Sequence, residues 1–462
     1  MSLSAALSIA LSGLRVATTQ MQLASNNISN AQTPGYTEKT ASLTADVFGS
    51  GDGGVNIASY TRSANAALTT SYNNATSQAS FYSTQNNYLT QVQSILGSNV
   101  NNPPLSTALA NFQSAWTQFS AAPEDSTQQQ SVIQAGVNLA NQIREVVSGV
   151  TTLTQQASSD INTTTNSLST DIANVASLNV QIAAATNGNQ PVGNLEDQRD
   201  QDINAIAAIT NVTVLQRPEN QVALYTPGGL LLLDGGTAQS FSYSGTDVVS
   251  SAGQIVTTAL TGGSLQAQIN FLSGSSSSSD PGTGVIGKIN SQLQTLTNAL
   301  TDATSGTPQT FANAYNSATT GTGELASSFF TVDGSSDPSS LAVNANLLNG
   351  TSTLKQASGA PVTAALAATR SFTASNLSVS GTYANLGTAI LSSFQQAANT
   401  VQTQSTSATQ QQSFYQQSLA NATGVNVDTE LTNLTVLQNS YAASAHVIST
   451  INAMLADLEN VL

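Results

Sequence analysis

The stretch that organises the chain reads VDTELTNLTVLQNSYAASAHVISTINAMLADLENVL and covers residues 427–462. Its large side chains recur every seven residues, and a second set follows three residues after the middle members of the first. The first set is Val427, Leu434, Tyr441, Ile448, Leu455 and Leu462, and the second is Leu437, Ser444, Ile451 and Leu458. This spacing is typical of a coiled-coil contact stripe, although the buried face of an ordinary core helix gives a similar pattern. The pattern by itself predicts a long helix and leaves its partner open.

A matching pattern begins the chain. Its two rows are Leu7, Leu14, Met21 and Ile28 on one side and Leu3, Ala10, Ala17, Ala24 and Ala31 on the other. Large residues in one row and alanines in the other allow a partner helix to approach closely. A strict seven-residue repeat at both ends favours pairing of the ends with each other, with neighbouring copies, or with both. We therefore predict a terminal coiled coil, with the middle of the chain as a long excursion between its two halves.

Charged residues make up only 7% of the 462 residues, against roughly 25% in ordinary soluble domains. No Asp, Glu, Lys or Arg occurs from Ser63 to Pro123 or from Ser371 to Val427. Asn, Gln, Ser and Thr interrupt every apolar run in these spans before a bilayer could be crossed, so we predict no membrane insertion. Such spans suit helices whose polar faces meet other protein.

The charge balance and the absence of cysteine exclude several classes of protein. The net charge is -15, and the nine Lys and Arg residues are scattered, so nucleic acid is not expected as a partner. A chain without cysteine forms no disulfide and no thiolate metal site, which fits a protein that works outside the reducing cytosol. The first cation is Arg15, inside the repeat, so we expect no cleaved signal peptide and an unconventional export route.

The sequence offers little for catalysis or cofactor binding. His446 is the only histidine, so most metal and nucleophile-base constellations cannot be built, and we predict no catalytic, metal or cofactor site. The glycines of residues 282–287 match a dinucleotide-binding fingerprint but follow a serine run in place of a strand. The densest acidic cluster, which we interpret as a solvated helix face, consists of Glu196, Asp197, Asp200 and Asp202.

Periodicity, Pro and Gly positions predict a mainly α fold with an inserted β-containing domain. We expect helices over residues 66–96, 105–119, 126–186, 195–209, 286–303 and 386–415, strands near 212–215, 221–225 and 229–233, and an extended loop or hairpin over 43–63. The predicted domains are a terminal coiled-coil assembly domain (1–32 and 425–462), an elongated helical domain (33–210 and 365–424) and an outer β-rich domain (211–364).

The turn after the first helix reads SNNISNAQTPGYT, residues 25–37. This string and the C-terminal string GVNVDTELTNLTVLQNSYAASAHVISTINAMLADL resemble the ends of the bacterial flagellar axial proteins, which comprise rod, hook and hook-associated families. The motif residues are Asn26, Asn27, Asn30, Thr33, Pro34, Gly35 and Tyr36. Pro-Gly-Tyr-Thr looks like the hook-associated protein 1 family, whereas hook proteins tend to have Gly-Phe-Lys. One departure is Glu38-Lys39, where that family usually has a basic residue directly after the threonine, which puts a local contact in doubt.

The resemblance implies a structural adaptor outside the cell, at the junction between flagellar hook and filament. It implies self-association in a helical ring, contacts with hook protein and with the second junction protein, a cytoplasmic export chaperone, and no cofactor. The implied assembly interface is Leu3, Leu7, Leu14, Met21, Ile28, Leu434, Leu437, Tyr441, Ile448, Ile451, Leu455 and Leu458.

Two other functions stay open at this point. A flagellar hook protein would share the terminal repeats and differ in the turn motif and the insert. A secreted adhesin or a polysaccharide-acting enzyme would suit the Ser/Thr/Asn-rich composition, but the paired terminal repeats argue against it.

Overall fold

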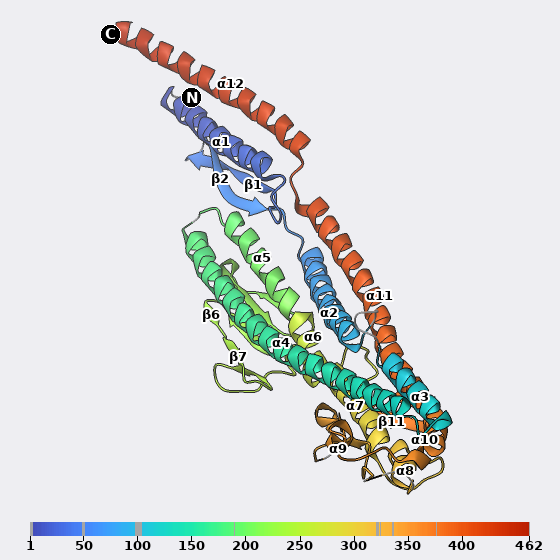
Figure 1. Ribbon diagram of the computed structural model, residues 1–462. Coiled ribbons are helices and arrows are strands. Elements are labelled where there is room, and N and C mark those ends of the chain that lie inside the picture. Colours follow the sequence, from blue (N-terminus) through green and yellow to red (C-terminus); the bar gives the residue numbers. More distant parts are fainter. Residues whose placement is uncertain are drawn as a thin grey trace. The chain divides into compact units, whose positions relative to one another are not determined.

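The computed structural model describes residues 3–48, 51–97, 104–188, 190–319, 323, 325–334, 337–375 and 377–461. The chain forms two compact units, each built from separate segments. Unit 1 combines Met1–Ala79, Thr165–Gly263 and Ala408–Leu462, and unit 2 combines Ser80–Thr164 and Ser264–Ser407. Helices dominate both units (Figure 1), as predicted, and long stretches of α2 (Ala66–Leu96), α4 (Ser126–Asn187) and α11 (Tyr383–Thr423) lie in each unit.

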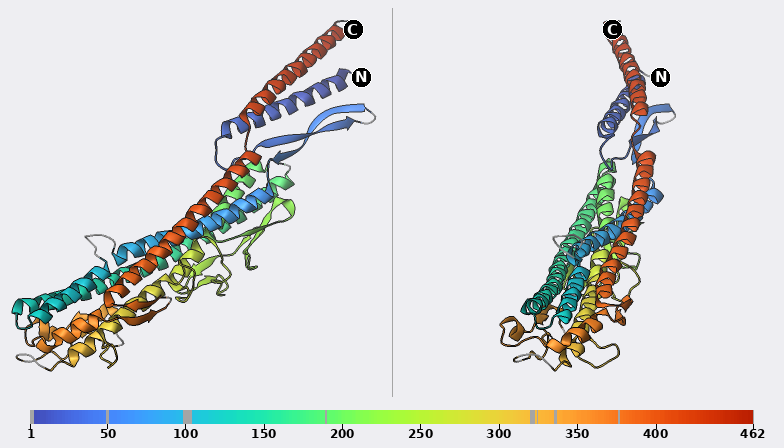
Figure 2. Two further views of the ribbon diagram at one scale, coloured as in Figure 1. Left: turned by 90° about the vertical axis from the view of Figure 1, so that its right-hand side faces the viewer. Right: turned by 45° about the vertical axis from the view of Figure 1, so that its right-hand side comes forward.

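In unit 1, α1 lies between α12 and a β-hairpin (Figures 1 and 2). The bounds are α1 (Leu3–Asn30), β1 (Lys39–Phe48), β2 (Gly51–Arg62) and α12 (Val427–Val461), and β1 pairs antiparallel with β2. The backbone of the hairpin approaches α1 closely, because the Val55 N–H donates to Ser12 Oγ at 3.1 Å. Gly54, at φ +111°, makes this approach possible, since any side chain there would collide with Ser12.

The start of α12 is fixed by its own sequence. Asn426 caps the helix, and its side-chain oxygen accepts from the N–H groups of Asp428 at 3.1 Å and Thr429 at 3.2 Å. Asp428 and Glu430 lie in the first turn, where the helix dipole favours negative charge. Residues 424–426 therefore separate α11 from α12 at a defined position.

The rest of unit 1 packs small sheets and α5 against the last turns of α4. The elements are α5 (Gly193–Ile209), β3 (Thr213–Gln216), β4 (Val222–Tyr225), β5 (Leu231–Asp234), β6 (Thr237–Ala238), β7 (Phe241–Tyr243) and β8 (Val248–Ser250). Strands β3 to β6 form one antiparallel sheet in chain order, and β7 pairs with β8. Asn179 of α4 is buried and joins helix to sheet, because its amide nitrogen donates to the carbonyls of Val222 and Gly235, both at 2.8 Å.

Unit 2 is built from helices and short strand pairs. Its elements are α3 (Leu105–Ala121), α6 (Gly263–Ser273), α7 (Val285–Thr301), α8 (Phe311–Asn316), β9 (Phe330–Thr331), β10 (Ala342–Val343), α9 (Ala345–Leu348), α10 (Gly359–Ala367), β11 (Arg370–Ala374) and β12 (Leu377–Gly381), together with parts of α2, α4 and α11. The strands pair as β9 with β10 and β11 with β12.

An aromatic cluster forms part of the core of unit 2. Phe112 and Trp116 of α3 are fully buried, and their ring centroids lie 6.2 Å apart in an edge-to-face arrangement. Phe311 of α8 and Phe329 contact both rings, at centroid distances of 5.3 to 5.8 Å. Edge-to-face packing places the positive ring edges against the negative ring faces and adds to the free energy of apolar burial. The core of unit 2 therefore depends on residues more than 200 positions apart.

The two units divide the chain along lines other than the predicted three domains. Residues 211–263 belong to unit 1, whereas residues 264–364 share the core of unit 2 with α3 and α4. The division into assembly, helical and outer domains stays a prediction.

Candidate functional site

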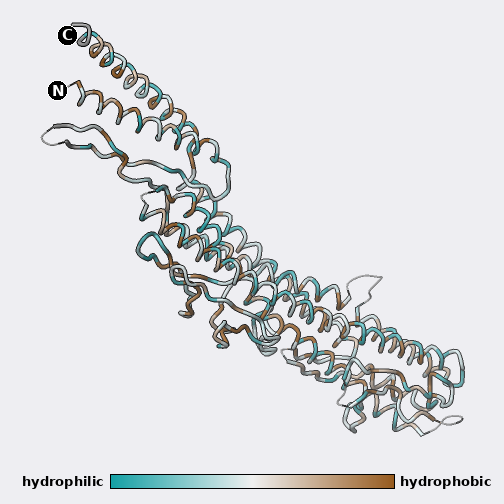
Figure 3. The backbone as a smooth tube through the Cα atoms, turned by 90° about the vertical axis from the view of Figure 1, so that its left-hand side faces the viewer, coloured by the Kyte–Doolittle hydropathy of each residue, from teal (hydrophilic) through white to brown (hydrophobic). Residues whose placement is uncertain are grey.

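Helices α1 and α12 contact each other (Figure 3 shows the apolar positions along both). Ala10, Ala17 and Ala24 are buried. A side chain added at Gly13 would lie 3.4 Å from Ser444 Oγ, so the two helix backbones are close at this point. Small residues on α1 thus allow the close approach, while the supercoiled geometry of a coiled coil stays a prediction.

The predicted interface residues differ in burial. Leu7, Leu14, Met21, Ile28, Leu434, Leu437 and Ile448 are half-buried, and Ile451 is buried. Leu3, Tyr441 and Leu455 are exposed at 38 to 39%. The side chain of Leu458, like all of Leu462, lies outside the described residues. The fold of unit 1 therefore covers the predicted stripe only in part and leaves Leu3, Tyr441 and Leu455 accessible.

Helix α12 carries a second apolar stripe that the sequence reasoning missed. Val436, Val447 and Met454 are exposed at 57, 46 and 46%. Their spacings of eleven and seven residues correspond to about three and two helical turns, so the three side chains share one side of the helix. The eleven-residue spacing was the signal that could have revealed this stripe.

Asn27 joins α1, the turn, β1 and α12 through one buried amide. Its nitrogen donates to the Lys39 carbonyl at 2.9 Å and to Glu430 Oε1 at 2.7 Å. Its oxygen accepts from the Lys39 N–H at 3.1 Å and from the Tyr36 hydroxyl at 2.9 Å. These bonds use both donors and both acceptor positions of the amide, and the side chain is almost inaccessible to solvent. Asn27 is therefore the residue that fixes the terminal helices to each other.

The neighbouring motif residues hold the turn locally. The amide nitrogen of Asn30 donates to the Asn26 carbonyl at 2.9 Å, and the Thr33 hydroxyl donates to Asn30 Oδ1 at 3.3 Å. The Tyr36 N–H then donates to the Thr33 carbonyl at 3.1 Å. These bonds end α1 and return the chain toward β1.

Pro34 and Gly35 bring the turn against α5. The amide nitrogen of Gln201 donates to the Pro34 carbonyl at 3.1 Å. Gly35 has φ +78°, a conformation that favours glycine, and a side chain there would collide with Gln201. The positive φ of residue 35 therefore favours glycine at this contact.

The carboxylate of Asp197 in α5 accepts hydrogen bonds from several groups of the segment after the turn. The Thr37 N–H donates to Asp197 Oδ2 at 3.1 Å, and the Thr37 hydroxyl donates to Oδ1 at 2.7 Å. Lys39 Nζ donates to the same carboxylate, and Arg62 NH1 does so at 3.0 Å. The side chains of Asp197 and Lys39 are 7% and 10% exposed, so this ion pair is largely shielded from water. The lysine of the Glu38-Lys39 departure therefore makes a buried ion pair with α5.

Arg62 extends the cluster along α5. Its Nε lies 3.0 Å from Glu196 Oε2, and its NH2 donates to Asp200 Oδ2 at 2.7 Å. The interpretation of this acidic cluster as a solvated helix face is wrong, because Asp197 is buried and Glu196 and Asp200 are ion-paired. Asp202 is in none of the ion pairs among the described residues.

Burial shapes the electrostatics of the turn. It lowers the pKa of Lys39, against the opposing effect of Asp197. Burial and then the charges of Asp197 and Glu430 raise the pKa of Tyr36 to about 12. Lys39 Nζ lies 3.4 Å from the centroid of the Tyr36 ring, so a neutral phenol faces the ammonium. The buried contacts of this site therefore hold the charges of Lys39 and Asp197 in fixed positions.

Asn27→Ala is expected to lower the free energy of unfolding of unit 1 by about 1 to 3 kcal/mol, because it leaves buried partners unsatisfied. Urea unfolding followed by circular dichroism measures the change. Asn26→Ala is the matched control, since Asn26 is exposed and offers the turn only its backbone carbonyl. Equal unfolding midpoints for the two variants would contradict the role of the buried amide.

Glu38→Gln is expected to stabilise unit 1 at neutral pH. Burial and then the charge of Glu430 raise the pKa of Glu38 in the folded chain above its unfolded value of about 4.3. The resulting loss of stability is absent below the unfolded pKa and complete above the folded pKa. The melting temperatures of the parent chain and of Glu38→Gln should coincide at about pH 4, and that of the variant should become the higher one as pH rises. Glu219→Gln, at an exposed position of the same unit, should show no such divergence.

The remaining sequence motifs have structural explanations. The glycines of residues 282–287 close the loop between α6 and α7, and Gly284, at φ +66°, is the residue before α7. His446 is exposed on α12. Within the described ranges, no three His, Cys, Asp or Glu side chains are grouped as a metal would require. No helix within these ranges has the length and apolar character to cross a bilayer.

Comparisons with known proteins give matches in two parts of the chain. The family described as "Flagellar hook-associated protein FlgK helical domain" matches residues 89–330, which is just over half of the 462 residues. The family described as "Flagellar basal body rod FlgEFG protein C-terminal" matches residues 416–461, which include α12.

Curated relatives and one solved structure are similar over part of their length. Flagellar hook-associated protein 1 of Escherichia coli is 26% identical over 241 residues, which are 50% of this chain and 44% of that protein. The Bacillus subtilis protein of the same name is 25% identical over 225 residues, 45% of this chain and 43% of that protein. The chain thus spans less than half the length of these relatives. The flagellar hook junction protein FlgK from Burkholderia pseudomallei aligns over 57% of this chain and 46% of its own, with 23% identity and a TM-score of 0.46.

Proposed function

Since the chain belongs to the flagellar hook-associated protein FlgK family, we propose that it is a structural adaptor that joins hook to filament. In this proposal the chain acts outside the cell, at the hook-filament junction, and carries out no catalysis. The curated relatives support the proposal through their shared name, Flagellar hook-associated protein 1.

The proposed partners are further copies of the chain in a helical ring, the hook protein and the second junction protein. A cytoplasmic chaperone accompanies the chain before export. Each copy uses one surface to contact a different surface of the next, and such heterologous contacts repeat along an open helix.

The observation that carries the proposal is the incomplete covering of the terminal helices. Asn27 and Glu430 join α1 to α12, yet Tyr441 and Leu455 at their predicted interface remain exposed, and so does the second stripe of Val436, Val447 and Met454. Exposed apolar rows on a paired helix have unburied area that neighbouring copies could cover. The proposed assembly therefore adds apolar burial to a pair that already exists in the single chain.

Val447→Asp is expected to weaken incorporation into hook ends by about tenfold or more, because it places a charge in a contact that must lose water. The melting temperature should stay unchanged, since Val447 is 46% exposed in the single chain. Incorporation is measured by electron microscopy of purified hooks incubated with the labelled chain.

The matched control for this test is Gln438→Asp. Gln438 is exposed on the same helix, about half a turn around the axis from Val447, and the variant introduces the same charge. It should assemble as the parent does. Normal incorporation of the Val447 variant would count against the second stripe as an assembly surface.

A further inference from the structure

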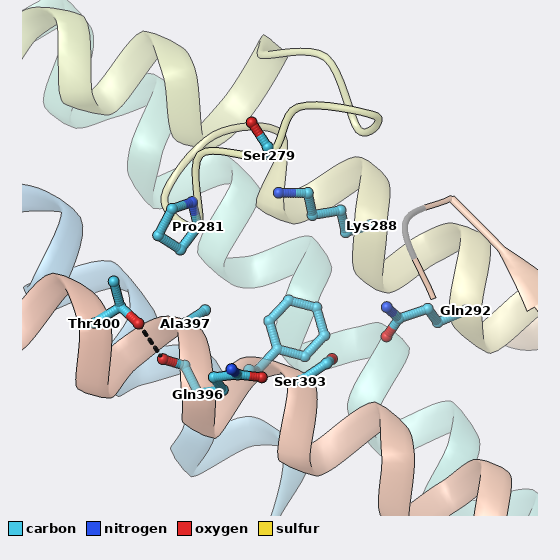
Figure 4. Close-up of a pocket in the computed structure, with 9 residues that line it drawn as sticks. Ser279, Pro281, Lys288, Gln292, Ser393, Gln396, Ala397 and Thr400 are labelled. Atoms are coloured by element: carbon cyan, nitrogen blue, oxygen red, sulfur yellow. Dashed lines mark hydrogen bonds between the residues drawn. The ribbon is translucent and has the colours of Figure 1, made fainter. Parts of the chain in front are cut away.

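A cavity of about 250 Å³ lies in unit 2 between α7, α11 and the segment that precedes α7 (Figure 4). Lys288 and Gln292 come from α7, Phe394 comes from α11, and Pro281 lies in the preceding segment. Figure 4 shows the ammonium of Lys288 and the amide of Gln292 directed into the same space, with Pro281 across from them. Nothing in the assembly role described above uses these residues.

Lys288 is a buried cation that forms no ion pair with a carboxylate in the part of the chain that the structure describes. The residue is 4% exposed, and its Nζ donates to the Asp280 carbonyl at 3.1 Å. None of the ion pairs among the described residues includes it. The Asp280 carboxylate instead accepts from the Thr283 hydroxyl at 2.5 Å and the Gly282 N–H at 3.3 Å. Burial lowers the pKa of Lys288, and the charge of Asp280 offsets this effect only in part.

The position of Lys288 on its helix is also unfavourable for its positive charge. Helix α7 begins at Val285, so Lys288 lies in its first turn. The helix dipole favours anions at that end and disfavours cations. An anion beside Lys288 would therefore interact favourably with both the ammonium and the helix.

Gln292 supplies a second unsatisfied group one turn further along α7. It is 1% exposed, and its Oε1 has no hydrogen-bond partner among the described residues. Residues four apart on a helix lie side by side, with Cβ atoms about 5 to 6 Å apart. The cavity thus presents a cation and an acceptor that needs a donor, and Phe394 and Pro281 offer apolar surface beside them.

We propose that this cavity binds a carboxylate whose carrier also donates a hydrogen bond, from a hydroxyl, an ammonium or an amide N–H, to Gln292. The carboxylate pairs with Lys288, and the carbon skeleton lies against Phe394. Two sources have this chemistry: a free hydroxy acid, such as a sugar acid, or an acidic side chain of a second copy together with its backbone N–H. The inference does not depend on the hook-filament role.

The test follows the lysine side chains by NMR in the full chain labelled with [13C]lysine. The lysines are Lys39, Lys288 and Lys355, so each signal is assigned by its Lys→Met variant. D-Glucuronate is the probe, and D-glucose is its neutral control. Glucuronate should shift the Lys288 signal alone, with saturation, and should raise the apparent pKa of Lys288, because a bound carboxylate favours the charged form.

Variants separate the two halves of the site. Lys288→Met should weaken glucuronate binding by about tenfold or more, the value of a charge-assisted contact. Lys355→Met is the matched control, because Lys355 is also a buried lysine of unit 2, with its Nζ donating to the Asn316 carbonyl at 2.8 Å. It should leave the affinity unchanged. Gln292→Leu should abolish the preference for glucuronate over acetate.

A dilution series of the same labelled chain distinguishes the sources. A Lys288 signal that ignores glucuronate but moves on self-association, together with weaker self-association of Lys288→Met, assigns the carboxylate to a second copy. A Lys288 signal that stays fixed in both series, or that responds equally to glucose and glucuronate, overturns the proposal.

Discussion

Asp197→Ala is expected to lower the free energy of unfolding of unit 1 by about 3 to 5 kcal/mol, because it leaves buried cations without their carboxylate. Lys39 and Arg62 both contact Asp197, and their side chains are 10% and 13% exposed. Urea unfolding measures the total loss. Hydrogen exchange at the Thr37 and Lys39 amides locates it, since both amides bond to side chains of this site.

Two further variants make the Asp197 result specific. Asp202→Asn, on the same helix, should be neutral or stabilising, because burial and Asp171 raise the pKa of Asp202. The double variant Lys39→Met, Asp197→Leu should be more stable than Asp197→Ala, because it removes both charges of one pair. A double variant as unstable as the single one would argue that Asp197 acts through shape and not through charge.

Phe112→Ala is expected to destabilise unit 2 by about 3 to 5 kcal/mol, the usual cost of removing a buried aromatic ring. Phe112 is fully buried and contacts rings from α3, α8 and β9. Trp116 is the only tryptophan of the chain and lies in the same cluster. Its fluorescence therefore reports the unfolding of unit 2 in urea.

Leu348→Ala is the control for the aromatic cluster. Leu348 also belongs to unit 2 but is 54% exposed, so its removal should change stability by about 0.5 kcal/mol or less. Similar losses for Phe112→Ala and Leu348→Ala would mean that the aromatic cluster contributes no more than a surface contact.

Helix positions could be predicted from the sequence because their signals are local. The predicted range 66–96 coincides with α2, and the predicted range 105–119 starts at the first residue of α3 (Leu105–Ala121). Proline fits the position before or within a first helical turn, and an apolar period of 3.6 marks the helix that follows. The short strands of residues 213–234 were predicted within two residues at each end for the same reason.

The charged cluster could not be predicted, because its partners are far apart in sequence. Asp197 pairs with Lys39 across 158 positions and with Arg62 across 135. From spacing alone, Glu196 and Asp200 only share a helix side, which is equally typical of a solvated surface. The asparagines of the motif were recognised by resemblance, but only the structure shows that Asn27 accepts and donates through every position of its amide.

For the segment 264–364, the sequence could not predict which core its large side chains enter. The sequence assigns this segment to the predicted outer domain, a division that stays a prediction, and in the structure Phe311 and Phe329 lie among the rings of α3. The average composition of such a segment mainly reflects its loops. A few large side chains determine which core the segment packs into. Isolated aromatic residues in such a segment are therefore better predictors of its packing than its average composition.

The hydrogen bond between Asn27 and Glu430 also means that the contact between α1 and α12 forms only once α12 is present. It joins residues 403 positions apart, and closing so long a loop in an unfolded chain costs about 5 kcal/mol in entropy. Before Glu430 is in place, one N–H of the Asn27 amide lacks the carboxylate oxygen to which it donates. A chain cut short before α12 would thus keep an unfinished, protease-sensitive end, whereas a full-length chain closes it. Unit 1 is therefore complete only in a chain that carries both α1 and α12.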